Sequence, residues 1–192
     1  MATAAGPYGM RPLRRIDGAA WSGSANYRVG AITSGSTVPI FFGDIVVSGS
    51  TGAIAPATAT SIVAFGVFQG VEYDTATGHV RNNQWVAGST GSNINAWVIV
   101  DSMIVWGIQA SASVQALDVG ANAPITAATS GQTRTGLSGQ ALDGGSIATT
   151  GTGPQILRIL GFQRTPFNAN TQVYPDLEVQ LNHSEFNTTT GV

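Results

Sequence analysis

The sequence predicts an all-β protein that folds as a β-sandwich or a jelly-roll-like barrel, with an extended N-terminal arm and a long Gly/Thr-rich loop. Short runs of β-branched and aromatic residues recur along the chain, and turns rich in glycine, serine and threonine separate them. No segment carries a sustained apolar stripe at helical spacing with a cap and a stop, so we expect little helix. The 192 residues suffice for one sizeable domain with an arm.

The start of the chain is predicted to be the extended arm, over residues 1–28, followed by a single β-domain over residues 29–192. It lacks a strand pattern and contains several prolines and glycines, as is typical of extended segments. Three of the eight basic residues of the chain, all of them arginines, gather there as Arg11, Arg14 and Arg15. We expect them to dock on an acidic partner surface, because arginine makes two-point contacts with carboxylates.

A solvated, disordered tail is the alternative interpretation of this segment. Such tails are usually polar throughout, whereas this one also carries Tyr8, Met10, Leu13, Ile16 and Trp21. These side chains reduce solubility unless they pack on something, so the composition favours docking.

Strand signals begin with residues 36–47, STVPIFFGDIVV, which a Gly–Asp pair interrupts. In residues 61–73, SIVAFGVFQGVEY, the odd-numbered positions are mostly apolar and are expected to face a core. Gly66 and Gly70 inside this run predict a bulge or the close approach of another backbone. Residues 95–110 indicate either two short strands or one long bent strand.

The second half of the chain has a weak strand signal at residues 113–125 and a clearer one at residues 153–166. Residues 175–186, PDLEVQLNHSEF, alternate most regularly, with leucine and valine expected to face inward. Residues 126–153 carry no strong core signal, and we expect them to form a long surface loop or an insertion.

The composition favours a surface that neighbouring molecules cover. Only 9% of the residues are charged, and small neutral residues take their place. An ordinary Gly/Thr-rich β-protein that tolerates few charges is the alternative. The net charge of −2 predicts little attraction to nucleic acid or to anionic membranes. The N-terminus lacks the pattern of a secretory signal, so we expect no export.

The sequence offers little catalytic chemistry, and we expect neither an enzyme nor a metal or other cofactor. The absence of lysine and cysteine excludes Walker A loops, Schiff-base lysines and thiol nucleophiles. The two histidines, His79 and His183, lie far apart, and His79 is expected in a solvated turn. Glu72 and Asp74 share one face of a strand, which suits a glycosidase pair or, as we prefer, two solvated charges. Asp101 is expected to cap a turn.

One set of segments resembles the structural proteins of tailed bacteriophages, in which a G-P-x-G-x-R-P motif leads into an arm and then a β-domain. The first segment is GPYGMRPLRRIDGAAWSGSANYRV, and the others are FFGDIVV, VAFGVFQGVEYD, LDVGANA, TGLSGQALD and QILRILGFQRTPFN. Within that set the chain is similar to capsid decoration, or cement, proteins. None of the segments is a catalytic signature.

The resemblance implies a virion structural protein that binds the outside of the phage head and stabilises the capsid lattice. Its implied partners are the major capsid protein and itself, as a homotrimer or a dimer, with no nucleic acid and no membrane. Its implied place is the capsid surface, after synthesis in the cytoplasm of the bacterial host. Residues 6–28 become the capsid-contacting arm, whose predicted binding residues are Tyr8, Arg11, Arg14, Arg15, Trp21 and Arg28.

Other functions remain open from the residues alone. The main one is a carbohydrate- or receptor-binding module on the virion surface, in which an exposed tryptophan stacks on sugar rings. Trp97 and Trp106 are expected in the core, which leaves Trp85 as the main candidate. A glycan-degrading enzyme that uses Glu72 and Asp74 is a further hypothesis. A major capsid protein is disfavoured, because the chain is short and lacks a long helix.

Overall fold

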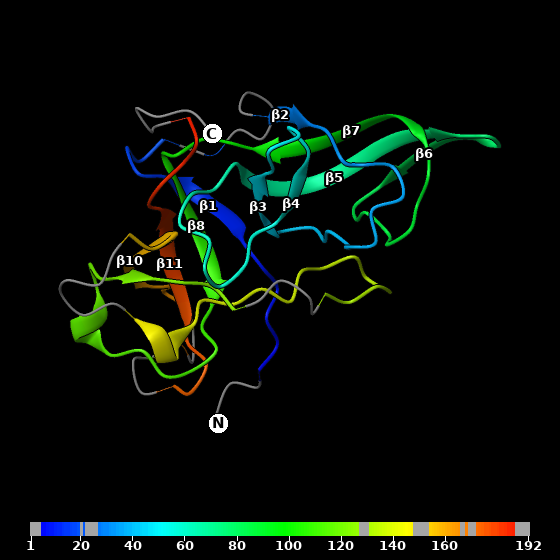
Figure 1. The fold of residues 1–192 in the computed structure, drawn as a ribbon. Coiled ribbons are helices and arrows are strands. Elements are labelled where there is room, and N and C mark those ends of the chain that lie inside the picture. The colour runs from blue at the N-terminus through cyan, green and yellow to red at the C-terminus, as the bar shows by residue number, and fades with distance from the viewer. Residues whose placement is uncertain are drawn as a thin grey trace.

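The computed structural model describes residues 5–19, 21, 27–126, 131–147, 154–165, 168 and 172–186. These residues form two antiparallel β-sheets, which pack as a sandwich and do not close into a barrel (Figure 1). The predicted all-β class is therefore confirmed, and of the two predicted architectures the structure has the sandwich. The helical content of the described residues is limited to two short 3-10 turns, η1 (Ala116–Asp118) and η2 (Gly144–Ser146).

The first sheet, sheet A, has five strands. In spatial order they are β1 (Arg11–Arg15), β8 (Ile104–Gln109), β11 (Asp176–Leu181), β10 (Leu157–Phe162) and β9 (Asn122–Ala123). Along β11 the buried residues Leu177, Val179 and Leu181 alternate with partly exposed ones, as the sequence predicted. Strand β8, between β1 and β11, is buried over its whole length, so both faces of sheet A are covered there.

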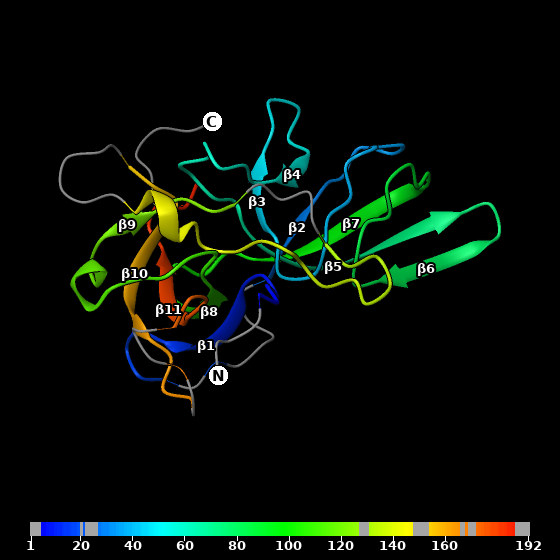
Figure 2. The same ribbon diagram turned by 90° about the horizontal axis from the view of Figure 1, so that it is seen from below.

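The second sheet, sheet B, has six strands. Its order is β2 (Tyr27–Gly30), β7 (Ser92–Ile99), β5 (Gly66–Thr75), β3 (Ile45–Ser48) and β4 (Ile54–Pro56), and β6 (Gly78–Asn82) pairs with β5. The strands β5, β6 and β7 extend beyond the body of the molecule as a wing (Figure 2). Residues 95–110 form two strands, β7 and β8, which belong to different sheets.

Both glycines that interrupt the 61–73 run are required by the fold. A Cβ atom at Gly66 would lie 2.3 Å from the carbonyl oxygen of Ile99, so no other residue fits this close approach. At Gly70 φ is +151° and the register between β5 and β7 shifts, which is the predicted bulge. The bulge changes which face the odd-numbered residues occupy. Val67 therefore packs in the core between the sheets, whereas Val71 packs in a second core.

The large apolar residues of the described chain form two separate cores. The core between the sheets contains Trp106, Ile108 and Val179 of sheet A together with Val67 of sheet B. The second core lies on the other face of sheet B and contains Trp85, Tyr73 and Phe68 among others. The first part of strand β5 is thus covered on both faces, which explains why five of its first six residues are buried.

The expectation that residues 126–153 form a surface loop is wrong for residues 136–142, whereas residues 132–135 are exposed as a loop would be. We call residues 131–142 the crossing segment. Its second half packs in the interior and contributes buried Ser138, Gln140 and Leu142. Parallel bridges join its residues to the chain on either side, Leu137 to Phe42 and Leu142 to Ala110. The sequence pattern missed this segment because polar side chains, rather than apolar ones, anchor it. Residues 127–130 and 148–153 lie outside the described residues.

Candidate binding site at the N-terminal strap

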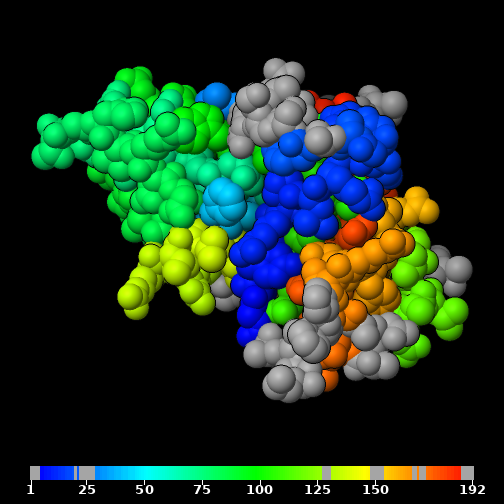
Figure 3. Space-filling view, turned by 180° about the vertical axis from the view of Figure 1, so that it is seen from behind, coloured from blue at the N-terminus to red at the C-terminus, as the bar shows by residue number. Residues whose placement is uncertain are grey.

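Residues 6–15, which we call the N-terminal strap, lie along the body of the molecule. Residues 11–15 form β1, where the sequence predicted an arm without a strand, and they pair with β8 at the edge of sheet A. A register shift between Pro12 and Arg14 breaks the two-residue alternation by which a strand is recognised. In Figure 3 the N-terminal residues, in blue, form a continuous band across this face. Residues 11–15 of the predicted arm are therefore integral to sheet A.

The GPYGM motif anchors the strap to the rest of the fold. Gly9 has φ +71°, and a Cβ atom there would lie 2.5 Å from the Cβ atom of Ser138 on the crossing segment. The next residue, Met10, is fully buried, and its N–H donates to the carbonyl oxygen of Gly43 at 2.8 Å. These contacts explain both the glycine and the methionine of the motif without a partner molecule.

Tyr8 is a second internal anchor. Its hydroxyl donates to Asp176 Oδ1 at 3.0 Å and accepts from Gln163 Nε2 at 3.2 Å. Burial, together with the negative charge of Asp176, holds the pKa of Tyr8 well above its usual range. The Arg11 guanidinium lies over the Tyr8 ring, 4.3 Å from its centroid. The side chain predicted to contact a capsid is thus engaged within its own chain.

Arg14 and Arg15 also have acidic partners within the molecule. Arg14 Nη2 lies 2.6 Å from Glu178 Oε2, and this ion pair spans the buried strand β8 from β1 to β11. Arg14 is opposite the buried Val105 of β8 in the strand register. Arg15 forms an ion pair with Asp101 and a second one with Asp17 at 3.2 Å.

Asp101 caps the turn between β7 and β8, as the sequence predicted, because its Oδ1 accepts from the Met103 N–H at 2.8 Å.

The two apolar side chains beside the charged part of β1 remain exposed. Leu13 is 40% and Ile16 43% exposed. The Ile16 N–H donates to the Met103 carbonyl at 2.7 Å, which brings a third exposed apolar residue alongside.

The structure brings together four of the six predicted binding residues. Tyr8, Arg11, Arg14 and Arg15 lie on the strap, whereas Trp21 is partly buried against the core between the sheets. Arg28 lies on β2 in the other sheet, where its backbone pairs with Val98. The side chain of Arg28 is outside the described part of the structure.

The carboxylate pair on β5 lies beside His79, which belongs to β6 and not to the turn in which it was expected. His79 Nδ1 lies 2.8 Å from Asp74 Oδ1 and its Nε2 lies 3.7 Å from Glu72 Oε2, because the β5–β6 hairpin pairs position 74 with 79. Hydrogen bonds from Asn93 and then from His79 lower the pKa of Asp74. The His79 side chain is 58% exposed, and the described residues hold no histidine–carboxylate group arranged for a metal ion.

The predictions for the tryptophans are partly wrong. Trp85, the main candidate for stacking on sugars, is fully buried, with Tyr73 packed edge-on against it. Trp97, expected in the core, is only partly buried, and the Arg81 guanidinium covers its ring at 4.2 Å. Trp106 is in the core as predicted. The carbohydrate-binding hypothesis thus loses its main residue.

The chain matches no protein-family model, no curated protein and no solved structure. In the described ranges, no helix has the length and apolar character needed to cross a membrane.

Proposed function

We propose that this chain is a virion structural protein that binds the outside of a phage head and stabilises the capsid lattice. Its partners in this proposal are the major capsid protein and further copies of itself, as a homotrimer or a dimer. The proposal includes no enzymatic activity, nucleic acid, membrane or cofactor. It assigns the protein to the capsid surface, after synthesis in the host cytoplasm.

The observation that carries the proposal is a large apolar side chain displayed on a rigid turn. Leu117 in η1 is 92% exposed on a chain with few charges. Asp118 Oδ2 accepts from the Gln115 N–H at 2.7 Å, and the Gly120 N–H donates to the Ile159 carbonyl at 2.8 Å. A leucine held outward in this way suits a contact with another protein, because its burial there contributes about 2 kcal/mol.

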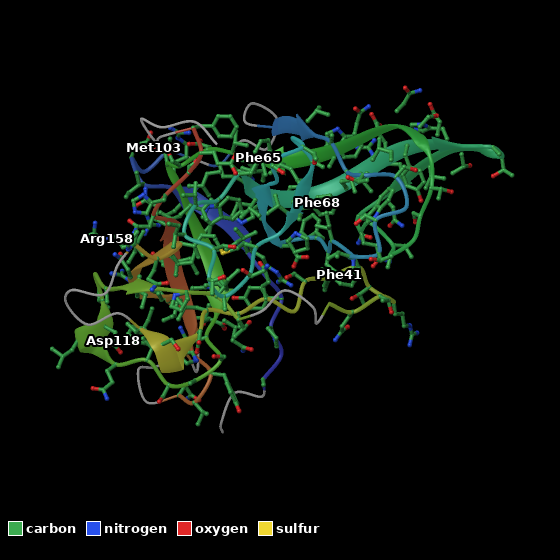
Figure 4. The ribbon with its side chains drawn as sticks, in the orientation of Figure 1. Phe41, Phe65, Phe68, Met103, Asp118 and Arg158 are labelled. Atoms are coloured by element: carbon green, nitrogen blue, oxygen red, sulfur yellow. The ribbon has the colours of Figure 1, made fainter. Side chains whose placement is uncertain are left out.

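The turn η1 lies at the end of the molecule opposite the wing, as the position of Asp118 in Figure 4 shows. Leu13 of the strap and the neighbouring pair Ile16 and Met103 are further exposed apolar side chains. On the strap, the Arg14 side chain is 48% exposed even though it pairs with Glu178. A protein that contacts several neighbours in a lattice needs more than one such surface.

Co-sedimentation with phage heads that lack the protein tests the proposal. We expect binding that saturates at a fixed number of copies per capsid subunit. Leu117→Ser should weaken that binding while leaving the thermal unfolding temperature unchanged, and Thr60→Ser on another exposed loop serves as the control. Absence of binding by the wild-type chain would refute the proposal.

A further inference from the structure

Asp44 is the only fully buried carboxyl group among the described residues. It follows the turn that leads into β3. One oxygen accepts from the Phe41 N–H at 2.8 Å, and the other accepts from the Ser138 hydroxyl on the crossing segment. Asp44 therefore joins β3 to the crossing segment in the interior of the protein.

The N-terminal strap covers this pair of residues. The Met10 N–H donates to the carbonyl of Gly43, which directly precedes Asp44. Gly9 lies so close to Ser138 that a Cβ atom there would be 2.7 Å from the Ser138 hydroxyl oxygen. Opening the strap would uncover both neighbours of the carboxyl group and let water reach it.

No cation faces Asp44 from the described elements packed against it. Phe68 of β5 contacts its backbone, with an N–H that donates to the Asp44 carbonyl at 2.8 Å. The charged or titratable side chains on those elements are engaged elsewhere. On the strap, Tyr8 bonds to Asp176, Arg11 stacks on Tyr8, and Arg14 and Arg15 pair with Glu178 and Asp101. On β5, Glu72 and Asp74 lie against His79, and Tyr73 packs against Trp85 in the second core. Arg134 of the crossing segment is exposed. Burial raises the pKa of Asp44 to about 7, although its two hydrogen bonds oppose this rise.

We propose that closure of the N-terminal strap is coupled to protonation of Asp44, so that the strap is held most firmly when the carboxyl is neutral and opens more readily when it is ionised. An ionised carboxylate regains its hydration when the strap opens, whereas a neutral carboxyl regains much less. Closing the strap therefore takes up a proton. Closure weakens as the pH rises from the ordinary range of aspartate towards 7 and is constant above that range. This coupling belongs to the isolated chain and holds whether or not the chain binds a capsid.

Limited trypsin digestion of the full chain between about pH 5 and about pH 8 tests the coupling. The cleavage sites in the strap are Arg14 and Arg15, because trypsin does not cleave the bond between Arg11 and Pro12. An unstructured arginine peptide in the same reaction corrects for the pH dependence of trypsin. Cleavage at the strap relative to the peptide should rise by up to about tenfold per pH unit and level off above about pH 7. The product should be a stable fragment that begins at Arg15 or at Ile16.

Two variants provide the controls. Asp44→Asn does not titrate and keeps an acceptor for the Phe41 N–H, so its relative cleavage should not change with pH. Tyr8→Phe removes the bond to Asp176, which does not involve the Asp44 carboxyl, so cleavage should be faster at every pH with the wild-type slope. The proposal is overturned if the wild-type ratio is flat, or if Asp44→Asn retains the slope. It is also overturned if the whole chain is degraded without a stable fragment. Should Asp44→Asn fail to fold, the wild-type and Tyr8→Phe profiles decide.

Discussion

Replacing Gln140 by alanine should test whether the crossing segment is part of the core. The Gln140 side chain is fully buried. Its Oε1 accepts from the Ile45 N–H at 2.7 Å, and its Nε2 donates to the carbonyls of Ile45 at 3.4 Å and Ala57 at 3.3 Å. Gln140→Ala removes all three bonds and leaves a cavity between the sheets.

The expected loss of unfolding free energy follows from these contacts. A buried N–H left without an acceptor costs about 1–3 kcal/mol, and the longest bonds add little. The lost packing of the side-chain methylene contributes about 1 kcal/mol more. We therefore expect Gln140→Ala to lower the free energy of unfolding by about 3 kcal/mol, a large share of the roughly 5–15 kcal/mol of a typical domain.

Urea unfolding followed by tryptophan fluorescence measures this loss, because buried Trp85 and Trp106 report on both cores. Gln132→Ala is the matched control on the same segment, since Gln132 is exposed and its side chain accepts only a 3.3 Å bond from Thr135. The control should lose less than about 0.5 kcal/mol. Gln140→Met restores the side-chain volume without the hydrogen bonds, so its loss of unfolding free energy should lie between those of Gln140→Ala and Gln132→Ala. Equal losses for Gln140→Ala and Gln132→Ala would show that the segment does not depend on its buried amide.

Gly9→Ala should destabilise the fold by about 3 kcal/mol or more, because a Cβ atom at this positive φ clashes with Ser138. Gly18 also has a positive φ but no neighbour near its Cβ position, so Gly18→Ala measures the backbone strain without the clash. Thermal unfolding of both variants compares the two effects. Arg14→Ala should cost at most about 1 kcal/mol, since the pair with Glu178 is partly exposed, and a larger loss of stability would contradict this assignment. The unfolding free energy of the wild type, relative to Asp44→Asn, should fall as the pH rises from about 4 to about 7, because the folded protein holds that proton more tightly than the unfolded chain. If the unfolding free energy of the wild type relative to Asp44→Asn rose with pH instead, Asp44 would hold its proton less tightly in the folded protein than in the unfolded chain, contrary to this prediction.

Local sequence patterns predicted the elements whose period is regular. The alternation of Leu177, Val179 and Leu181 predicted β11, and it appears in the structure without a shift. The glycines of the 61–73 run predicted the close approach at Gly66 and the bulge at Gly70. These predictions succeeded because side-chain period and backbone sterics act within a few residues of each other.

The strap and the crossing segment were missed for a common reason. Contacts with residues far away in the sequence stabilise both of them, as between Tyr8 and Asp176 or between Gln140 and Ile45. A polar side chain reveals such a role only when its buried partner is known. The strap therefore had no strand pattern, and the crossing segment had no pattern that indicated its burial. The same holds for Asp44, which the sequence presented only as part of an interruption in a strand.

The sequence by itself determined the all-β class, the positions of the regular strands and the absence of lysine and cysteine chemistry. These properties follow from composition and from periods of two residues. Only the tertiary structure decided that the arginines of the strap have internal partners, that Trp85 is buried and Trp97 partly exposed, and that a buried carboxyl lies beneath the strap. Burial and pairing depend on which strands become neighbours, and long-range sheet pairing is set by the energy of the whole fold rather than by any one segment.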